Sequence, residues 1–277
     1  MHKAMNESFN FNRFWTYFKY DLKQMWRNHS KAALVIGGSI AFLYVIWVLF
    51  SLVFTQTWQA PHFGARFSVL LLAFTVLEFY QTRTYGYLTE KKAGSSWLMI
   101  PASRAEKFVS MLLMTLVVIP VFFFAVYFLI DGLLSLVDPT YGQALITGFS
   151  DAYRAIIVWL TSVNSESLIV FTPGALLFMG IAGFFCNFLY FLLCGICFKK
   201  NKIVVAIAIL FGLSLVLSIL TGLIIPQFAG NIAHFDWDEN NAARLLAGIL
   251  NGFEVLICLL AVGLGWGVWH RIKTIQH

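Results

Sequence analysis

Two cysteines near the end of a long apolar segment have a spacing that could do redox or metal chemistry. Cys194 and Cys197 are separated by Gly195 and Ile196, and pairs spaced in this way occur in redox and metal-binding motifs. A metal site would also need a second cysteine pair or a nearby histidine, and the neighbouring sequence contains neither. The sequence therefore favours small residues that let helices pack closely, not a redox or metal centre.

Motifs of three common enzyme classes are absent from the sequence. A nucleotide-binding P-loop needs glycine before Lys-Ser or Lys-Thr, and the only lysine followed by such a residue is Lys273, which follows Ile272. No histidine precedes a glutamate, as the His-Glu-x-x-His helix of zinc proteases requires. No Gly-x-Ser-x-Gly elbow of serine hydrolases occurs. We therefore expect a chain that is not an enzyme and uses neither a metal nor a cofactor.

The composition is that of a membrane protein. Hydrophobic residues make up 60% of the chain and charged residues 12%, with a mean hydropathy of +0.78, which lies outside the range of soluble domains. An apolar helix needs about 20 residues to cross a bilayer. The sequence predicts an all-α integral membrane protein, with residues 1–277 forming one transmembrane domain. Its six predicted spans are residues 32–54, 64–82, 108–130, 167–198, 203–225 and 245–269.

Lysine and arginine are divided unequally between the two sets of loops. Sixteen lie in residues 1–31, 83–107, 199–202 and beyond 270, whereas Arg66, Arg154 and Arg244 lie in the other loops. Cytoplasmic loops carry the excess of positive charge in membrane proteins, so we expect both termini and the 83–107 loop to be cytoplasmic. Because the charge is spread over four segments beside the membrane, it does not indicate binding to nucleic acid.

Residues 9–27 have an amphipathic pattern and precede the first span. Apolar and aromatic residues gather on one helical face and basic residues on the other. The two sets are Phe11, Phe14, Trp15, Phe18, Leu22 and Met25, and Arg13, Lys19, Lys23 and Arg27. Such helices lie in the membrane interface, with the basic face toward anionic headgroups. We predict an interfacial helix in contact with membrane lipids, with packing against a neighbouring cytoplasmic domain as the alternative.

The two loops expected on the outer side are too short for a folded domain. Residues 131–166 contain a predicted short amphipathic helix at 151–162, and residues 226–244 contain Asp238, a suitable N-cap for the last helix.

Polar residues inside the predicted spans are costly and therefore mark candidate sites. One set shares a single face of the second span, and we expect this stripe to point at another helix or subunit, in a structural or a gating role. Its members are Thr75, Glu78, Thr82 and Tyr85. In the sixth span, Asn251 and Glu254 could line a polar pathway, with a hydrogen bond between helices as the alternative.

The polar 83–107 loop contains two features of its own. Ser103 and Glu106 have the spacing of a capping box, which predicts that a helix begins there. Ahead of Pro101, residues 97–100 are apolar but too short to cross a bilayer. This stretch is suited to contact another protein at the cytoplasmic face.

The layout of six spans, an interfacial helix and this loop resembles the permease subunit of ABC type-2 transporters. In that family the loop runs from Glu and basic residues through a Gly and a short apolar helix to Leu-Pro-x-Ser-Arg. Here the corresponding residues are Glu90, Gly94, Trp97 to Ile100, Pro101, Ser103 and Arg104, with Ile100 in place of Leu. The chain departs from the family at Ser110 and Met111, where the family often has a lysine.

The resemblance implies a multi-pass protein of the bacterial plasma membrane that is driven by a separate cytoplasmic ATPase subunit. A second permease subunit, identical or different, would complete the path, and the exported substrate would be hydrophobic or amphipathic. Residues 94–100 would form a coupling helix in a groove of the ATPase, with Trp97 as its aromatic anchor; the alternative for Trp97 is an anchor in the lipid headgroup layer. The coupling residues would be Glu90, Gly94, Trp97, Leu98, Met99 and Ile100. Two alternatives remain, a non-transporting scaffold or immunity subunit and an ion-coupled carrier.

Overall fold

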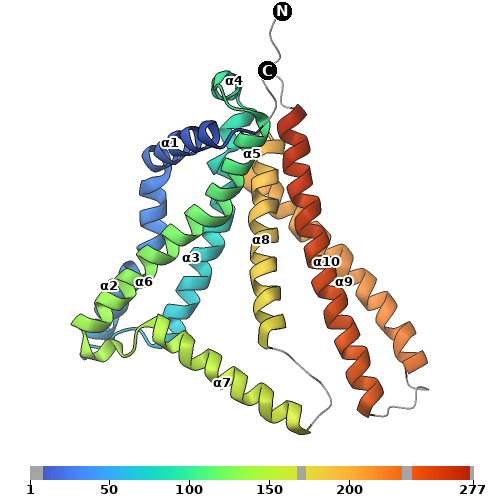
Figure 1. Ribbon diagram of the computed structural model, residues 1–277. Helices are drawn as coiled ribbons and strands as arrows, with labels where there is room; N and C mark the ends of the chain where they lie inside the picture. Colours follow the sequence, from blue (N-terminus) through green and yellow to red (C-terminus); the bar gives the residue numbers. More distant parts are fainter. Residues whose placement is uncertain (1–8, 167–172, 233–238, 275–277) are drawn as a thin grey trace, which may run out of the picture.

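The computed structural model describes residues 9–166, 173–232 and 239–274, except for the side chains of residues 91–93, 156, 159–166, 173–176, 224–232 and 239–251. Within the described residues the chain is helical and contains no strand (Figure 1). Six of its helical segments are long and apolar enough to cross a membrane. These two observations confirm the prediction of an all-α protein with six helical segments that could cross a membrane.

The predicted interfacial helix and the first span form two consecutive helices, α1 (Phe11–Gly37) and α2 (Ser39–Phe54). The side chain of Asn10 caps α1 by accepting hydrogen bonds from the backbone N–H groups of Asn12 and Arg13. The break falls at Gly38, later than the boundary near residue 28 that the sequence suggests. Figure 1 shows α1 crossing the top of the molecule before the chain turns down into α2.

Helix α3 (Phe63–Thr84) matches the second predicted span. A short 3-10 turn, η1 (Gly86–Thr89), connects it to α4 (Lys91–Met99), which begins three residues before the expected coupling helix and ends one residue earlier. Helix α4 projects at the end of the molecule where α1 begins and α10 ends (Figure 1).

The third span is one continuous helical segment made of α5 (Arg104–Leu113), a π-helical turn η2 (Met114–Val118) and α6 (Ile119–Val137). The predicted capping box is present, since the side chain and backbone N–H of Ser103 both bond to Glu106. The π turn lies just before Pro120, whose ring removes one backbone donor and disfavours a regular α-helical bond there.

The helix around residues 151–162 and the last two helices are longer than the sequence suggests, whereas the described part of the fourth span lies within its predicted range of 167–198. The short helix predicted at 151–162 is the middle of α7 (Leu145–Glu166), and a 3-10 turn, η3 (Pro139–Tyr141), precedes it. Helices α8 (Pro173–Cys197), α9 (Lys202–Ile232) and α10 (Glu239–Thr274) follow. The loop expected at 226–244 is therefore mostly helical, because α9 and α10 extend into it from both sides. The predicted N-cap Asp238 lies outside the described residues.

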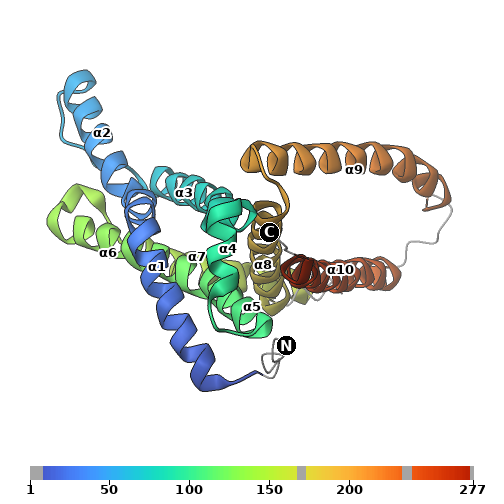
Figure 2. The ribbon, with the colours of Figure 1, turned by 90° about the horizontal axis from the view of Figure 1, so that it is seen from above.

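The two larger apolar clusters hold most of the helices together. One joins α2, α3, α6, α7 and α8 around Leu77, Phe123 and Phe188, and the other joins η1, α4, α5, η2, α8 and α10. In the most apolar 18-residue stretch of the α5–α6 segment, 33% of the residues are buried. In the corresponding stretches of α9 and α10, only 6% are buried. Figure 2 shows α9 starting near α3 and then extending away from α1 to α6. The described parts of the two C-terminal helices thus leave most of their apolar surface open to lipid or to another chain.

Candidate functional site

The indole of Trp97 lies inside the protein, not on the outer face of α4. Trp97 is 3% exposed, and its Nε1–H donates a hydrogen bond of 3.0 Å to the hydroxyl of Tyr17 on α1. The Lys107 ammonium donates to the Trp97 carbonyl at 2.8 Å and lies 4.6 Å from the centre of the indole ring. The expectation that Trp97 inserts into a partner is therefore wrong. A ring that finds an acceptor for its N–H, a cation and apolar neighbours within its own chain is more stable buried there.

The outward surface of α4 is formed by other residues of the predicted set. Met99 is 82% exposed and Leu98 is 39% exposed. Glu90 precedes the helix and is exposed, Ile100 is half-buried and Gly94 is buried. An interaction with a partner would thus use Met99 and Leu98, with Glu90 at the start of the helix, while Gly94 and Trp97 hold the helix against its own protein.

A buried carboxylate connects α1 to the start of α5. Glu106 is fully buried and receives the Arg13 guanidinium through Nε and Nη2 at 2.7–3.0 Å. The backbone N–H groups of Asn10 and Ser103 donate to the same carboxylate at 2.9 and 2.8 Å. Charge-assisted bonds that engage both oxygens fix geometry strongly. Glu106, which belongs to the capping box of α5, therefore also anchors the beginning of α1.

A second carboxylate, Asp21, connects α1 to the segment after α3 and to α5. Asp21 is 5% exposed, and its Oδ2 accepts hydrogen bonds of 2.7 Å from both the Tyr85 and the Ser110 hydroxyl. Ser110 lies in the region where ABC type-2 permeases, which this chain resembles, often have a lysine. In this protein Asp21 is therefore bonded there to a hydroxyl group and not to a cation. Tyr85, a member of the stripe that was predicted to point at another helix or subunit, thus bonds to α1.

Behind these polar contacts, an apolar cluster extends to the C-terminal helices. Trp97 packs in one cluster with residues of η1, α5, η2, α8 and α10, which are Tyr85, Leu88, Met111, Met114, Leu192, Ile196, Val268 and Ile272. At its edge the Lys202 ammonium, at the start of α9, bonds to the Gly86 carbonyl and to the Thr89 hydroxyl. Because apolar interiors are close-packed, a displacement of α4 would press on α1, α5, α8 and α10 together.

The predicted stripe on α3 is only partly buried. Glu78 is 8% exposed and Thr82 is fully buried, as expected, but Thr75 is exposed and bonds to the Leu71 carbonyl of its own helix. The burial of Thr75 was therefore predicted wrongly, whereas Thr82 lies where Gly195 of α8 packs closely against α3. Asn187 on α8 donates to the Glu78 carboxylate at 3.4 Å. This contact is the hydrogen bond between helices that the structural interpretation of Glu78 predicts.

The remaining sequence candidates do not meet in one site. Glu254 is partly exposed on α10, and the side chain of Asn251 lies outside the described part of the chain. In the Cys-x-x-Cys segment, Cys194 is buried and Cys197 is exposed, and both are free thiols. A Cβ at Gly195 would lie 2.5 Å from the Thr82 carbonyl oxygen, so this segment packs α8 closely against α3. Among the described residues no group of three acidic, histidine or cysteine side chains could hold a metal.

A buried ion pair at the far end of the molecule was missed by sequence reasoning. Arg66 on α3 and Asp131 on α6 are 2% and 1% exposed, and their Nη1 and Oδ1 atoms are 3.2 Å apart. The Tyr141 hydroxyl and the Leu145 N–H donate to Asp131 at 2.8 and 2.6 Å, and Arg66 also donates to the Gln143 carbonyl. The sequence did contain a signal for this pair. Arg66 lies near the start of the second predicted span and Asp131 directly follows the third, so antiparallel spans would bring the two residues to the same end of the molecule.

Comparison of this chain with protein-family models, with curated proteins and with solved structures gives no match.

Proposed function

We propose that this chain is the permease subunit of an ATP-driven transporter of the ABC type-2 kind, moved by a separate ATPase that binds α4. The observation that carries the proposal is the division of α4 into two faces. Its inner face is locked to the protein by Trp97, and its outer face presents Met99 and Leu98. A short helix that cannot cross a bilayer, yet is held firmly and is apolar on its free side, is suited to receive a partner and transmit its motion.

The contacts of α4 offer a direct route for that motion. The bond from Trp97 to Tyr17 reaches α1, and the bond from Lys107 to the Trp97 carbonyl reaches α5. The apolar cluster around Trp97 extends to α8 and α10. An ATPase that pushes on Met99 and Leu98 would therefore shift the ends of several spans at once, because packed interiors transmit displacement.

The proposed orientation in the membrane rests on the distribution of lysine and arginine, and the proposed partner subunit rests on the exposed apolar surface. The positive-inside rule supports a cytoplasmic position for the α4 end and both termini, and the resemblance to bacterial permeases supports the plasma membrane of a bacterium. The exposed apolar faces of α9 and α10 suit a second permease subunit as well as lipid. An apolar substrate path between two such subunits would favour a hydrophobic or amphipathic cargo, and export is the direction that we propose.

The test is recovery of the ATPase with variants of Met99. The tagged chain is purified from its native membranes, and co-purifying proteins with a nucleotide-binding P-loop are identified by mass spectrometry. We expect one such ATPase, and we expect Met99→Asp to lower its recovery at least about fivefold, because losing one apolar interface anchor costs about 1 kcal/mol or more. Met99→Leu keeps the apolar contact and is the matched control.

Both variants should fold normally, since substitutions at exposed positions usually change stability by less than about 0.5 kcal/mol. Recovery of no ATPase, or equal recovery with Met99→Asp at matched expression, would refute the proposal. Activity of the purified chain without any ATPase would favour an ion-coupled carrier instead.

A further inference from the structure

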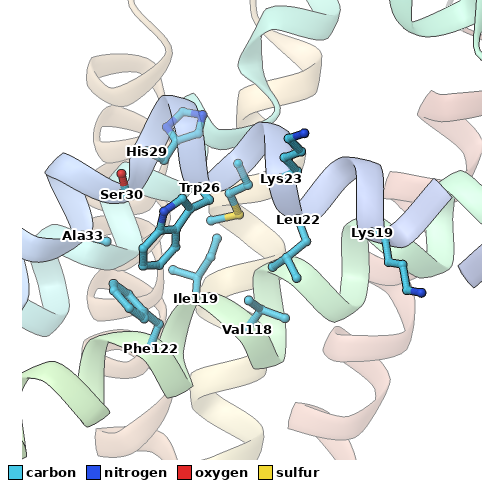
Figure 3. Close-up of a pocket in the computed structure, with 11 residues that line it drawn as sticks. Lys19, Leu22, Lys23, Trp26, His29, Ser30, Ala33, Val118, Ile119 and Phe122 are labelled. Carbon is cyan, nitrogen blue, oxygen red and sulfur yellow. The ribbon is translucent and has the colours of Figure 1, made fainter. Parts of the chain in front are cut away.

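A cavity of about 530 Å³ lies between α1 and the helix formed by η2 and α6. Its apolar lining comes from both sides, as Figure 3 shows, with Leu22 and Trp26 reaching from α1 toward Val118, Ile119 and Phe122. Its volume falls within the range of about 300–1,000 Å³ that is common for ligand sites. Among the described side chains none of α7 to α10 lines it, although Met25 and Val118 of its lining also pack against the apolar cluster behind α4.

The cavity opens to the surface of the molecule. Trp26 is 56% exposed and Leu22 is 38% exposed, whereas Ala33 and Ile119 are 9% and 3% exposed and form its buried part. Trp15, also on α1, is 45% exposed. Exposed tryptophans beside lysines are typical of the level at which lipid headgroups meet acyl chains. An open apolar cavity at that level is filled most simply by the tail of a neighbouring lipid.

Two cations stand at the edge of the cavity. Lys19 and Lys23 belong to its lining and are exposed, and Figure 3 shows their amines outside the cluster of apolar side chains. The Lys19 ammonium also lies 5.3 Å from the Trp15 ring. The nearest acid on α1, Asp21, is buried and bonded to Tyr85 and Ser110. Among the described residues no ion pair neutralises either lysine, so the edge of the cavity favours an anion.

We propose that this cavity binds an anionic glycerophospholipid, with one acyl chain between α1 and α6 and the phosphate beside Lys19 and Lys23. The surrounding bilayer is as apolar as the cavity, so burial of the chain discriminates little between lipids. Selection then depends on the headgroup, and each lysine near an anionic headgroup should strengthen binding about fivefold. Removal of both lysines should weaken it about 25-fold.

The experiment is native mass spectrometry of the purified full chain in detergent that contains equal amounts of phosphatidylglycerol and phosphatidylcholine. The wild type should retain one phosphatidylglycerol in preference to phosphatidylcholine. The double variant Lys19→Gln, Lys23→Gln should lose most of this preference. The double variant Arg27→Gln, Lys31→Gln removes the same charge from α1 at positions that do not line the cavity, so it should keep the preference.

A second variant tests the cavity itself. Ala33→Phe places a ring in the buried part of the cavity and should abolish retention of the lipid, while thermal unfolding monitors that the chain remains folded. Ala33→Leu adds a smaller side chain at the same position. An intermediate loss of lipid retention in this variant would support the same site. Equal retention of both lipids by the wild type, equal loss in the two double variants, or full retention in a folded Ala33→Phe chain would each overturn the proposal and leave only ordinary surrounding lipid.

Discussion

Replacement of Asp131 by alanine should destabilise this protein more than almost any other single change among its charged residues. Asp131 is 1% exposed and uses both carboxylate oxygens, accepting from Arg66, from the Tyr141 hydroxyl and from the Leu145 N–H. Arg66 is itself 2% exposed, and its Nε is buried without a partner. Removal of the acid would therefore leave a buried cation that keeps the Gln143 carbonyl and the nearby Tyr141 as partners but has no opposite charge beside it among the described residues.

The magnitude follows from the cost of an uncompensated buried charge. Breaking a buried ion pair from one side costs about 3–5 kcal/mol, and each buried donor left unpaired adds a cost of its own, about 1–3 kcal/mol before relaxation. For proteins of about 150–250 residues, 1 kcal/mol corresponds to a shift of about 2–4 °C in Tm. We therefore expect Asp131→Ala to lower Tm by at least about 6 °C.

The assay is thermal unfolding in detergent, at matched expression and purity, with two comparisons. Asp151 is exposed, so Asp151→Ala should shift Tm by no more than about 2 °C. The double variant Arg66→Met, Asp131→Leu removes both charges and should be more stable than Asp131→Ala, because apolar residues can replace a buried pair at little cost. A shift below about 3 °C for Asp131→Ala, or a double variant less stable than the single one, would refute this reasoning.

Three further predictions concern Asp138, Trp97 and the membrane topology. Burial alone would raise the pKa of Asp138, but hydrogen bonds from Trp58, Thr140 and Tyr44 outweigh it and lower the pKa from 3.8 to about 2. Its stabilising contribution should thus be complete above pH 3.8 and lost as the pH falls toward 2, and the Tm difference between wild type and Asp138→Asn, measured from about pH 5 to about pH 2, should shrink over that interval. Trp97→Ala should cost about 3–5 kcal/mol through the lost packing, whereas Trp97→Phe should cost less because it removes mainly the bond to Tyr17; Tm of the two variants checks the order. In a cysteine-free background, cysteines at the exposed positions Ser96 and Gln59 should label from opposite sides of a sealed membrane, and labelling of both from one side would contradict the six-span topology.

The sequence by itself determined the features that depend on neighbours along the chain. Apolar runs of sufficient length predicted six candidate spans, because a bilayer requires about 20 apolar residues from each helix. The spacing of Ser103 and Glu106 predicted where the third span begins, because a capping box is formed within four consecutive residues. The loop before it was correctly expected to contain a short helix.

Tertiary structure alone decided which side of each helix meets another part of the protein. The short apolar stretch at residues 97–100 fits an outward or an inward indole equally well, and only the approach of Tyr17 and Lys107 turns it inward. The exposed Thr75 and the buried Thr82 lie on one face of α3 and differ because of where α8 packs. Arg66 and Asp131 are 65 positions apart, and their pairing depends on how α3 and α6 are aligned. Burial and pairing are properties of contacts between distant segments, so no local pattern in the sequence encodes them.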